Sequence, residues 1–487
     1  MEILGDIICW EISKKKTLVA TFSLCLLGIE SVEASGFRLT EQSLNGTALN
    51  SAFVAGAYGA DSTYYNPANM SLGKDSDKWE FEVNGQLLWI PGFSFDTENM
   101  DKGGSAFGGA ILIGCANPKN NCPKRVDGKA NDTIQPVPKF FLKSRPYSVS
   151  PDVVANFGFS FTTPSGLSMD WDGAGGGFLD DVSIAMMEFN PVMSFAYKDM
   201  FAFAFGLRGI YTFGSFNNSL YVPYDVPNLS SGTSYVQQTS NASGFGFGYN
   251  MAASIKPFAS FSSETLKSLT LSATYRSQVS MNTKGSLSAV AAVDTGILGK
   301  GTVDMNADLT LMVDLPHIIN LAISQDFGRN RLEFVWEYTF WGSARIFEFG
   351  YANQVFSNMQ GDKSFIDLGL DYISNMLGYA DYSAVAYGNG WKDSNAYRLG
   401  YTFFGDHYKI MGSIAYDETP APQGRFGIPD ANAYMFGVGY RQQFMSDKLD
   451  LGIAYSLALK DNRESFVVSH DGFGQLHVLT IGAKYLW

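Results

Sequence analysis

Few residues in this 487-residue chain could carry catalysis. Its histidines are His317, His407, His470 and His477. A hydrolase needs a histidine beside a serine or an acid, and His407, which follows Asp406, is the one sequence hint of such a pair. A turn containing both residues explains the pair equally well. The chain also lacks a Gly-x-Ser-x-Gly elbow, an HExxH helix and a Walker loop, so the sequence predicts no enzyme.

Cys115 and Cys122 are the cysteines that could do chemistry in a mature protein. They bracket "ANPKNN", a turn-rich insert, and this pattern predicts a loop disulfide in an oxidising compartment. A metal site is the weaker interpretation, because two thiols with no nearby histidine or third cysteine do not complete a tetrahedral ligand set. We therefore expect no metal and no cofactor.

Residues 1–34 have the features of an export signal. Lys14-Lys15-Lys16 form a positive region, Thr17–Ile29 are apolar, and Val32-Glu33-Ala34 resembles a small-residue cleavage site. The alternative, a buried N-terminal helix, does not explain this order of charge, apolar run and small residues. We expect cleavage after Ala34, which leaves Ser35 as the first mature residue.

The composition points to a membrane protein without membrane helices. The chain is 46% hydrophobic and 15% aromatic but only 17% charged, and it has no apolar run of about 18 residues. The net charge of −13, with no basic run after residue 34, argues against nucleic acid as a partner. Few charges, many aromatics and abundant glycine are typical of a transmembrane β-barrel.

Alternating residues support this interpretation. In "FAFAFGLRGIYTF", large apolar residues from Phe201 to Leu207 alternate with small or polar ones, and the same period recurs along the chain. A soluble β-sandwich would also alternate, but its strands are usually about 5–6 residues long, whereas membrane strands need about 9–11. The observed runs reach membrane length, so the predicted fold is all-β, a transmembrane antiparallel barrel.

The patterned runs number fourteen, an even number, as expected for a bacterial barrel. Short joins at 198–200 and 445–447 predict turns, and the longest insert, residues 349–391, is expected to contain a short helix at 363–377. The predicted strands are 79–91, 135–147, 151–163, 183–198, 200–216, 243–258, 266–283, 306–325, 330–348, 392–405, 407–418, 431–444, 447–460 and 473–487.

Residues 35–78 do not alternate and are too few for a domain. A barrel of this girth has an open lumen unless something fills it. We therefore expect residues 35–78 to form a plug, or hatch, inside a barrel of residues 79–487. The alternative is a disordered tail, given the Gly and Ser content.

Several segments in order along the chain match one protein family. Residues 35–70, which begin Ser35-Gly36-Phe37 and contain Asn66-Pro67-Ala68, resemble the hatch of the FadL/TodX family of outer-membrane transporters. The other matching segments are 274–285, 315–323, 338–343, 396–403 and, as the most specific, 417–440. Together these matches cover nearly all of the mature chain.

The resemblance implies a fourteen-stranded barrel in the bacterial outer membrane, plugged by a hatch. It implies transport of long-chain fatty acids or other hydrophobic molecules, captured by outer loops, held in a lumenal pocket and released sideways at a kinked third strand. Gly166 aligns with the kink glycine of the family, and Pro164 beside it also interrupts pairing. We expect Asn66-Pro67-Ala68 to pack against this kink, with the Asn66 amide bonding backbone groups that the kink leaves unpaired. The expected surroundings are outer-membrane lipid and lipopolysaccharide, and the expected state is a monomer.

One departure from the family concerns the ligand. Basic residues near the fatty-acid carboxylate in the family fall here around Asn218 and Glu348, which are not basic. The remaining candidates for ligand binding are Phe37, Arg208, Arg276 and Arg345. Aromatic or other neutral hydrophobic ligands therefore stay open, and a general porin or an outer-membrane hydrolase are the alternatives of another class.

Overall fold

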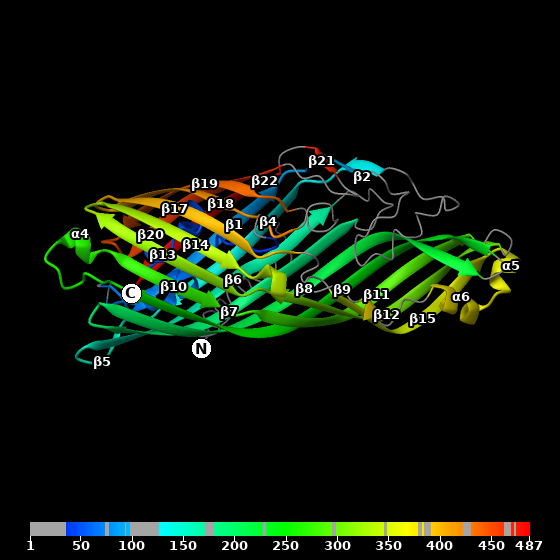
Figure 1. Ribbon diagram of the computed structural model, residues 1–487, viewed down its shortest axis with the longest axis horizontal. Coiled ribbons are helices and arrows are strands. Elements are labelled where there is room, and N and C mark those ends of the chain that lie inside the picture. The colour runs from blue at the N-terminus through cyan, green and yellow to red at the C-terminus, as the bar shows by residue number, and fades with distance from the viewer. Residues whose placement is uncertain are drawn as a thin grey trace, which may run out of the picture.

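The chain forms a closed barrel around a central segment (Figure 1). The computed structural model describes residues 36–73, 77–92, 94–97, 126–170, 180–226, 230–294, 299–344, 348–377, 382–383, 391–421, 430–461, 469–471 and 474–487. The first wall strand, β1 (Glu80–Ile90), pairs with the second, β4 (Thr133–Lys143), and also with the last, β22 (Gln475–Leu486). This double pairing closes the sheet, so the barrel has no free edge there.

The wall crosses fourteen times, as predicted, and every pairing along it is antiparallel. Three crossings are interrupted, so each consists of two strands: β10 with β11, β12 with β13, and β14 with β15. Between β4 and β22 the wall strands are β6 (Val153–Asp170), β7 (Asp181–Tyr197), β8 (Phe201–Val226), β9 (Ser230–Ile255), β10 (Thr270–Arg276), β11 (Val279–Asp294), β12 (Lys300–Leu315), β13 (Ile318–Phe327), β14 (Asn330–Thr339), β15 (Glu348–Gly361), β17 (Ser394–Phe404), β18 (Tyr408–Asp417), β19 (Ala433–Phe444) and β20 (Leu449–Lys460).

Short elements complete the described part of the chain. Strands β2 (Ser94–Thr97), β3 (Val126–Lys129) and β21 (Ser469–Asp471) form a small separate sheet, while β5 (Tyr147–Ser150) and β16 (Tyr382–Ser383) extend the barrel sheet. The helices are α2 (Leu44–Ala48), α3 (Ser62–Tyr65), η1 (Pro67–Met70), α4 (Glu264–Lys267), η5 (Trp341–Ser343), α5 (Lys363–Ile366) and α6 (Leu370–Leu377). Among the residues described, no helix combines the length and apolar content needed to cross a membrane.

Alternation along each strand produces two different faces. Phe201, Phe203 and Phe205 are 41–47% exposed on the outside of β8, whereas Ala202 and Ala204 between them are fully buried. Large apolar side chains outside and small or polar ones inside suit a wall surrounded by lipid.

The two ends of the barrel differ. Figure 1 shows the C-terminus, α4 and β5 at one end, which we call the turn end because short connections such as 198–200 and 445–447 lie there. The opposite, loop end carries α5 and α6. Both helices fall within the predicted helix at 363–377.

The predicted strand ends were wrong at the loop end. β8 and β9 have 26 residues each, far more than the about 9–11 needed to cross a membrane. β15 occupies part of the insert predicted for 349–391. The extra residues are rich in Asn, Ser and Tyr and do not alternate clearly between apolar and polar types, so a search for period two misses them.

The barrel interior is divided into two halves by chemistry. Toward the turn end, inward side chains form buried ion pairs, such as Lys143 with Glu80 and Arg441 with Asp450. Residues 36–73, which we call the N-terminal segment, are largely buried within this polar half. Toward the loop end, the inward residues form one large apolar cluster that includes Met281, Leu287 and Val313.

Candidate functional site

The third crossing, β6, is incompletely paired. β4 bonds β6 only between Phe140–Lys143 and Gly158–Phe161, although β6 continues to Asp170. On its other edge β6 follows β7, with a register shift between Thr162 and Ser165 that makes a bulge around Pro164. Proline has no N–H for a ladder bond, so it favours this irregularity. Beyond Phe161, the edge of β6 that faces β4 therefore has no ladder partner among the described strands.

The N-terminal segment supplies the missing bonds at this edge. The backbone N–H of Leu39 donates to the Pro164 carbonyl at 2.9 Å, and the Gly166 N–H donates to the Phe37 carbonyl at 2.9 Å. Arg38 and Ser165 form an antiparallel bridge between these bonds. Residues 37–39 thus act as a short substitute strand over the break in β6.

Gln42 extends this cover with its side chain. Its amide nitrogen donates to the Thr163 carbonyl at 2.8 Å, and its amide oxygen accepts the Thr163 N–H at 3.0 Å. A side-chain amide has a donor and an acceptor, so it can satisfy both backbone groups of one residue. We call residues 37–42 the β6 cover.

Tyr65 ties the β6 cover to the rest of the N-terminal segment. Its hydroxyl accepts the Gln42 N–H at 2.6 Å and donates to the Thr40 carbonyl at 3.1 Å. Burial raises the pKa of the Tyr65 phenol well above its ordinary value, so the hydroxyl keeps the proton that it donates. A displacement of the cover therefore disturbs α3 as well.

Gly36 and Phe37, the first residues of the N-terminal segment, lie against the apolar cluster. The Phe37 ring meets Trp341 edge-on at 4.9 Å between centroids and Trp391 at 6.0 Å. Gly36 has a φ of +77°, and a Cβ there would lie 2.6 Å from the Trp391 ring, so only glycine fits without displacement. The Gly36 N–H donates to Asp430 at 3.2 Å.

Asn66-Pro67-Ala68 lie elsewhere, which corrects the predicted contact with the strand-three kink. The Asn66 amide donates to the Val54 carbonyl at 2.9 Å and to Ser254 of β9 at 3.0 Å. Ala68 packs in a cluster of small residues from β7, β8 and β9. The unpaired groups of β6 are bonded by residues 37–42 instead, because these reach the wall in an extended conformation.

The arginines proposed for ligand binding are held by protein partners. Arg208 donates to Glu188 at 2.9 Å and to the Ser277 carbonyl at 2.6 Å. Arg276 pairs with the other oxygen of Glu188 and lies 4.3 Å from the Tyr64 ring centroid. Both guanidinium groups are buried, and this triad links β7, β8 and β10 across the lumen wall. Ser35, Arg345, Cys115, Cys122 and the predicted leader, residues 1–34, lie outside the described residues.

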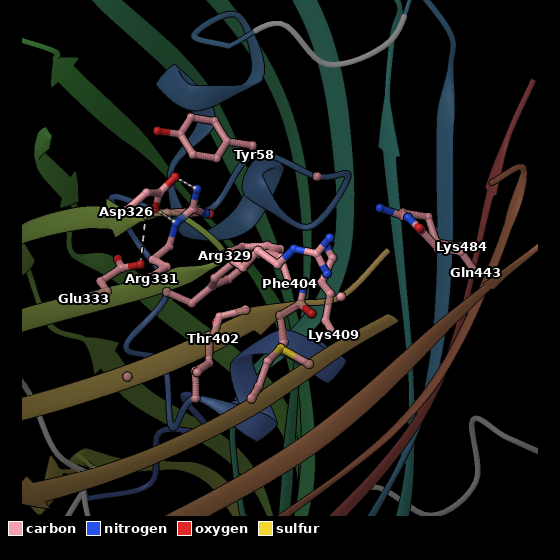
Figure 2. Close-up of a pocket in the computed structure, with 18 of the residues that line it drawn as sticks. Tyr58, Asp326, Arg329, Arg331, Glu333, Thr402, Phe404, Lys409, Gln443 and Lys484 are labelled. Atoms are coloured by element: carbon pink, nitrogen blue, oxygen red, sulfur yellow. Dashed lines mark hydrogen bonds and ion pairs between the residues drawn. The ribbon is translucent and has the colours of Figure 1, made fainter. Parts of the chain in front are cut away.

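A polar cavity of about 760 Å³ separates the N-terminal segment from the barrel wall at the turn end (Figure 2). Figure 2 shows Asp326, Arg331 and Glu333 on one side of it and Lys484 on the other. Glu333 accepts the N–H groups of Val54, Ala55 and Gly56 at 2.5–3.0 Å, and Arg331 bonds Asp326 and the Gly56 carbonyl. These charged residues anchor the segment, and the lining also includes the apolar side chains of Phe53, Phe404 and Met411.

The Asp406–His407 pair has no catalytic geometry. Asp406 bonds Arg329, and His407 faces Asp447 at 3.2 Å, all on exposed turns. The turn interpretation of this pair therefore fits the structure, and the hydrolase interpretation has no support in it.

Comparisons with known proteins identify the family. The model of the family described as "Outer membrane protein transport protein (OMPP1/FadL/TodX)" matches residues 25–478. The chain belongs to this family. It is therefore an outer-membrane transporter of hydrophobic compounds and not an enzyme, and the short turns mark the periplasmic end of the barrel.

Solved structures share the fold at low sequence identity. A Pseudomonas aeruginosa FadL homologue is 17% identical with a TM-score of 0.65, over 93% of this chain and 99% of that one. The Ralstonia pickettii toluene transporter TbuX is 13% identical with a TM-score of 0.53, over 92% and 98%. The P. putida toluene transporter TodX is 12% identical with a TM-score of 0.55, over 91% and 99%. A comparison with curated protein sequences finds no match.

Replacing Gln42 with leucine should loosen the β6 cover. The change leaves the Thr163 N–H and carbonyl without their partner, which costs about 1–3 kcal/mol for a buried polar group. Hydrogen exchange of peptides covering 36–42 and 162–168 should then be roughly 5- to 150-fold faster. Gln325→Leu is the matched control, because Gln325 bonds loop residues at the periplasmic end. Unchanged exchange at residues 162–168 would show that Gln42 does not hold the cover closed.

Proposed function

We propose that the protein moves a hydrophobic molecule from the cell exterior into the outer membrane and releases it sideways between β4 and β6. The N-terminal segment, within the predicted hatch of residues 35–78, closes this exit, and the β6 cover must withdraw to open it. The observation that carries the proposal is the division of the lumen, which is apolar toward the outside and charged toward the periplasm.

An apolar stripe supports entry from outside. Along β11 and β12, inward residues face each other in rows that run from the outer end of the strands toward Phe37. The rows are Ala291–Val303, Ala289–Met305, Leu287–Ala307, Gly285–Leu309, Thr283–Leu311, Met281–Val313 and Val279–Leu315. The twelve residue-to-residue steps from Val279 to Ala291 span about 40 Å. A path of this length suits a molecule with a long hydrocarbon chain.

The polar half of the barrel supports lateral exit. A hydrocarbon chain that left through the periplasmic cavity would contact Arg331, Asp326 and water, and would lose about 0.8 kcal/mol for each exposed CH₂ group. The break between β4 and β6 opens toward lipid, where this cost does not arise. Phe37 lies at the junction, since it contacts the apolar cluster and bonds Gly166 of β6.

The proposed substrates are long-chain fatty acids. Neutral aromatic compounds are the second candidate, because Arg208 and Arg276 are held by Glu188 and because Phe37, Trp341 and Trp391 form an aromatic group at the end of the stripe. Two of the similar structures are described as toluene transporters, which fits this second candidate.

Replacing Leu287 with glutamine tests the path. Leu287 is 1% exposed on the inner face of β11, so an amide there places a polar group in the stripe. Uptake of labelled oleate by cells carrying the variant should fall about tenfold, the factor that corresponds to about 1.4 kcal/mol. Uptake of labelled toluene, measured in parallel, distinguishes the two substrate classes.

Val290→Gln is the matched control, because Val290 lies on the outer face of the same strand and is 46% exposed. Heat-modifiable gel mobility confirms barrel assembly for both variants. Equal uptake by the Leu287→Gln and Val290→Gln proteins, for oleate and for toluene, would mean that the stripe is not the path.

A further inference from the structure

The lipid-facing wall contains an apolar hollow of about 620 Å³ that the transport path does not use. Its floor is Ala253 of β9 and Ala273 of β10, which are directly paired. Barrel walls are convex on the outside, so a hollow there needs small side chains among large ones.

The strand register shows how the hollow is enclosed. In the row of the two alanines, Phe203 stands on one side and Leu321, followed by Trp336, on the other. The next row toward the periplasm is Phe201, Ile255, Leu271, Ile323 and Phe334. The next row toward the outside is Phe205, Met251, Tyr275, Ile319 and Tyr338. Large side chains therefore surround the two alanines on all four sides, and we call this hollow the alanine socket.

The socket lies near the periplasmic end of the barrel wall. Ile255 and Leu271 border it, and the connection between them, residues 256–269, runs along the periplasmic rim. This connection exposes Phe261 at 49% and Leu266 at 42%, as expected for a segment at the membrane–water interface. Within the described part of the chain, Lys267 of the same connection pairs with the exposed Glu264, a surface ion pair of small energy that a lipid phosphate can replace.

We propose that the alanine socket binds an acyl chain of a phospholipid from the periplasmic leaflet, with its phosphate beside Lys267. An acyl chain that fills the hollow makes dispersion contacts with its walls, and these contacts are lost if the hollow stays empty. The basic group at the rim favours an anionic head group. The site is distinct from the lumen, so it does not depend on the proposed transport route.

The test measures phospholipid retained by the protein after purification in a neutral detergent, using native mass spectrometry and added phosphatidylglycerol. The wild type should keep bound phospholipid, and the Ala253→Leu/Ala273→Leu protein should lose most of it, because two leucines fill the socket. Lys267→Gln should lower retention of phosphatidylglycerol roughly fivefold, the factor for about 1 kcal/mol per basic residue near a membrane surface. Val438→Phe, a bulkier residue on the lipid face of β19, is the matched control and should retain lipid like the wild type.

A second measurement, fluorescence quenching, uses the protein with an unaltered socket. Phosphatidylglycerol with brominated chains should quench the fluorescence of Trp336, identified by subtracting the spectrum of the Trp336→Phe protein. Absence of this quenching would overturn the proposal. So would equal lipid retention in the filled and control variants, retention of detergent alone, or a dimer that dissociates when the socket is filled, because a second copy would then be the occupant.

Discussion

Deletion of residues 36–73 should raise the ion conductance of the protein in planar bilayers, by an amount on the order of tenfold. Barrels of eight strands are filled by their own side chains, whereas barrels of 16–18 strands leave a water-filled channel. A barrel of fourteen strands is close in size to these wide barrels, so its lumen should hold a water-filled channel when the N-terminal segment is removed. The deletion also removes the contacts of Phe37 with Trp341 and Trp391, and leaves charged side chains such as Glu333 and Arg441 to line a hydrated lumen.

The Leu287→Gln protein is the control for this experiment, because it keeps the N-terminal segment and should conduct like the wild type. Gel mobility before and after heating should show that the deletion variant still forms a barrel. Wild-type conductance in an assembled deletion variant would contradict a plug made of residues 36–73.

A disulfide between residues 38 and 165 should stop uptake reversibly. Arg38 and Ser165 are an antiparallel bridge pair, and side chains directly opposite each other have Cβ atoms about 4.5–5.5 Å apart, a spacing that needs only a small adjustment for a disulfide. In the Arg38→Cys/Ser165→Cys protein, oxidation would fix the β6 cover to β6. Glu337 keeps a cationic neighbour without Arg38, since Arg398 lies 3.5 Å away, so we expect the variant to fold.

The barrel was predictable from the sequence because the alternation of apolar and polar residues is visible within each strand. The alternation from Phe201 to Leu207 follows directly from a strand with lipid on one side, and the short turns at 198–200 and 445–447 interrupt it visibly. β15 was not predictable, because its residues do not separate into an apolar and a polar face. The same holds for the sequence of the outer halves of β8 and β9.

The site was predictable only in part. Pro164 and Gly166 indicated a break in β6, and the structure has one there. The residues that cover the break were assigned wrongly: Asn66-Pro67-Ala68 looked suited to a wall contact, but Gln42 and the backbone of residues 37–39 make it. A single glutamine carries no pattern, and its partner Thr163 is 121 residues away. The contact depends on how the N-terminal segment folds back into the barrel, which local sequence does not specify.

Pairing of arginines in the lumen was also hidden from the sequence. Glu188 lies 20 residues before Arg208 and 88 residues before Arg276, and only the closed barrel brings the three together. Trp341 and Trp391 likewise meet Phe37 only in the folded lumen. These contacts therefore form only when the sheet closes, and the local sequence does not predict them.

Lateral release at β6 is tested most directly by oleate uptake through the Arg38→Cys/Ser165→Cys protein, measured oxidised and then after reduction. The wild type, treated in the same way, controls for effects on the native cysteines. We predict that the oxidised variant takes up oleate at the background rate and that reduction restores uptake. Equal uptake in the two states, with the cross-link confirmed by mass spectrometry, would show that the molecule leaves the barrel without movement of the β6 cover.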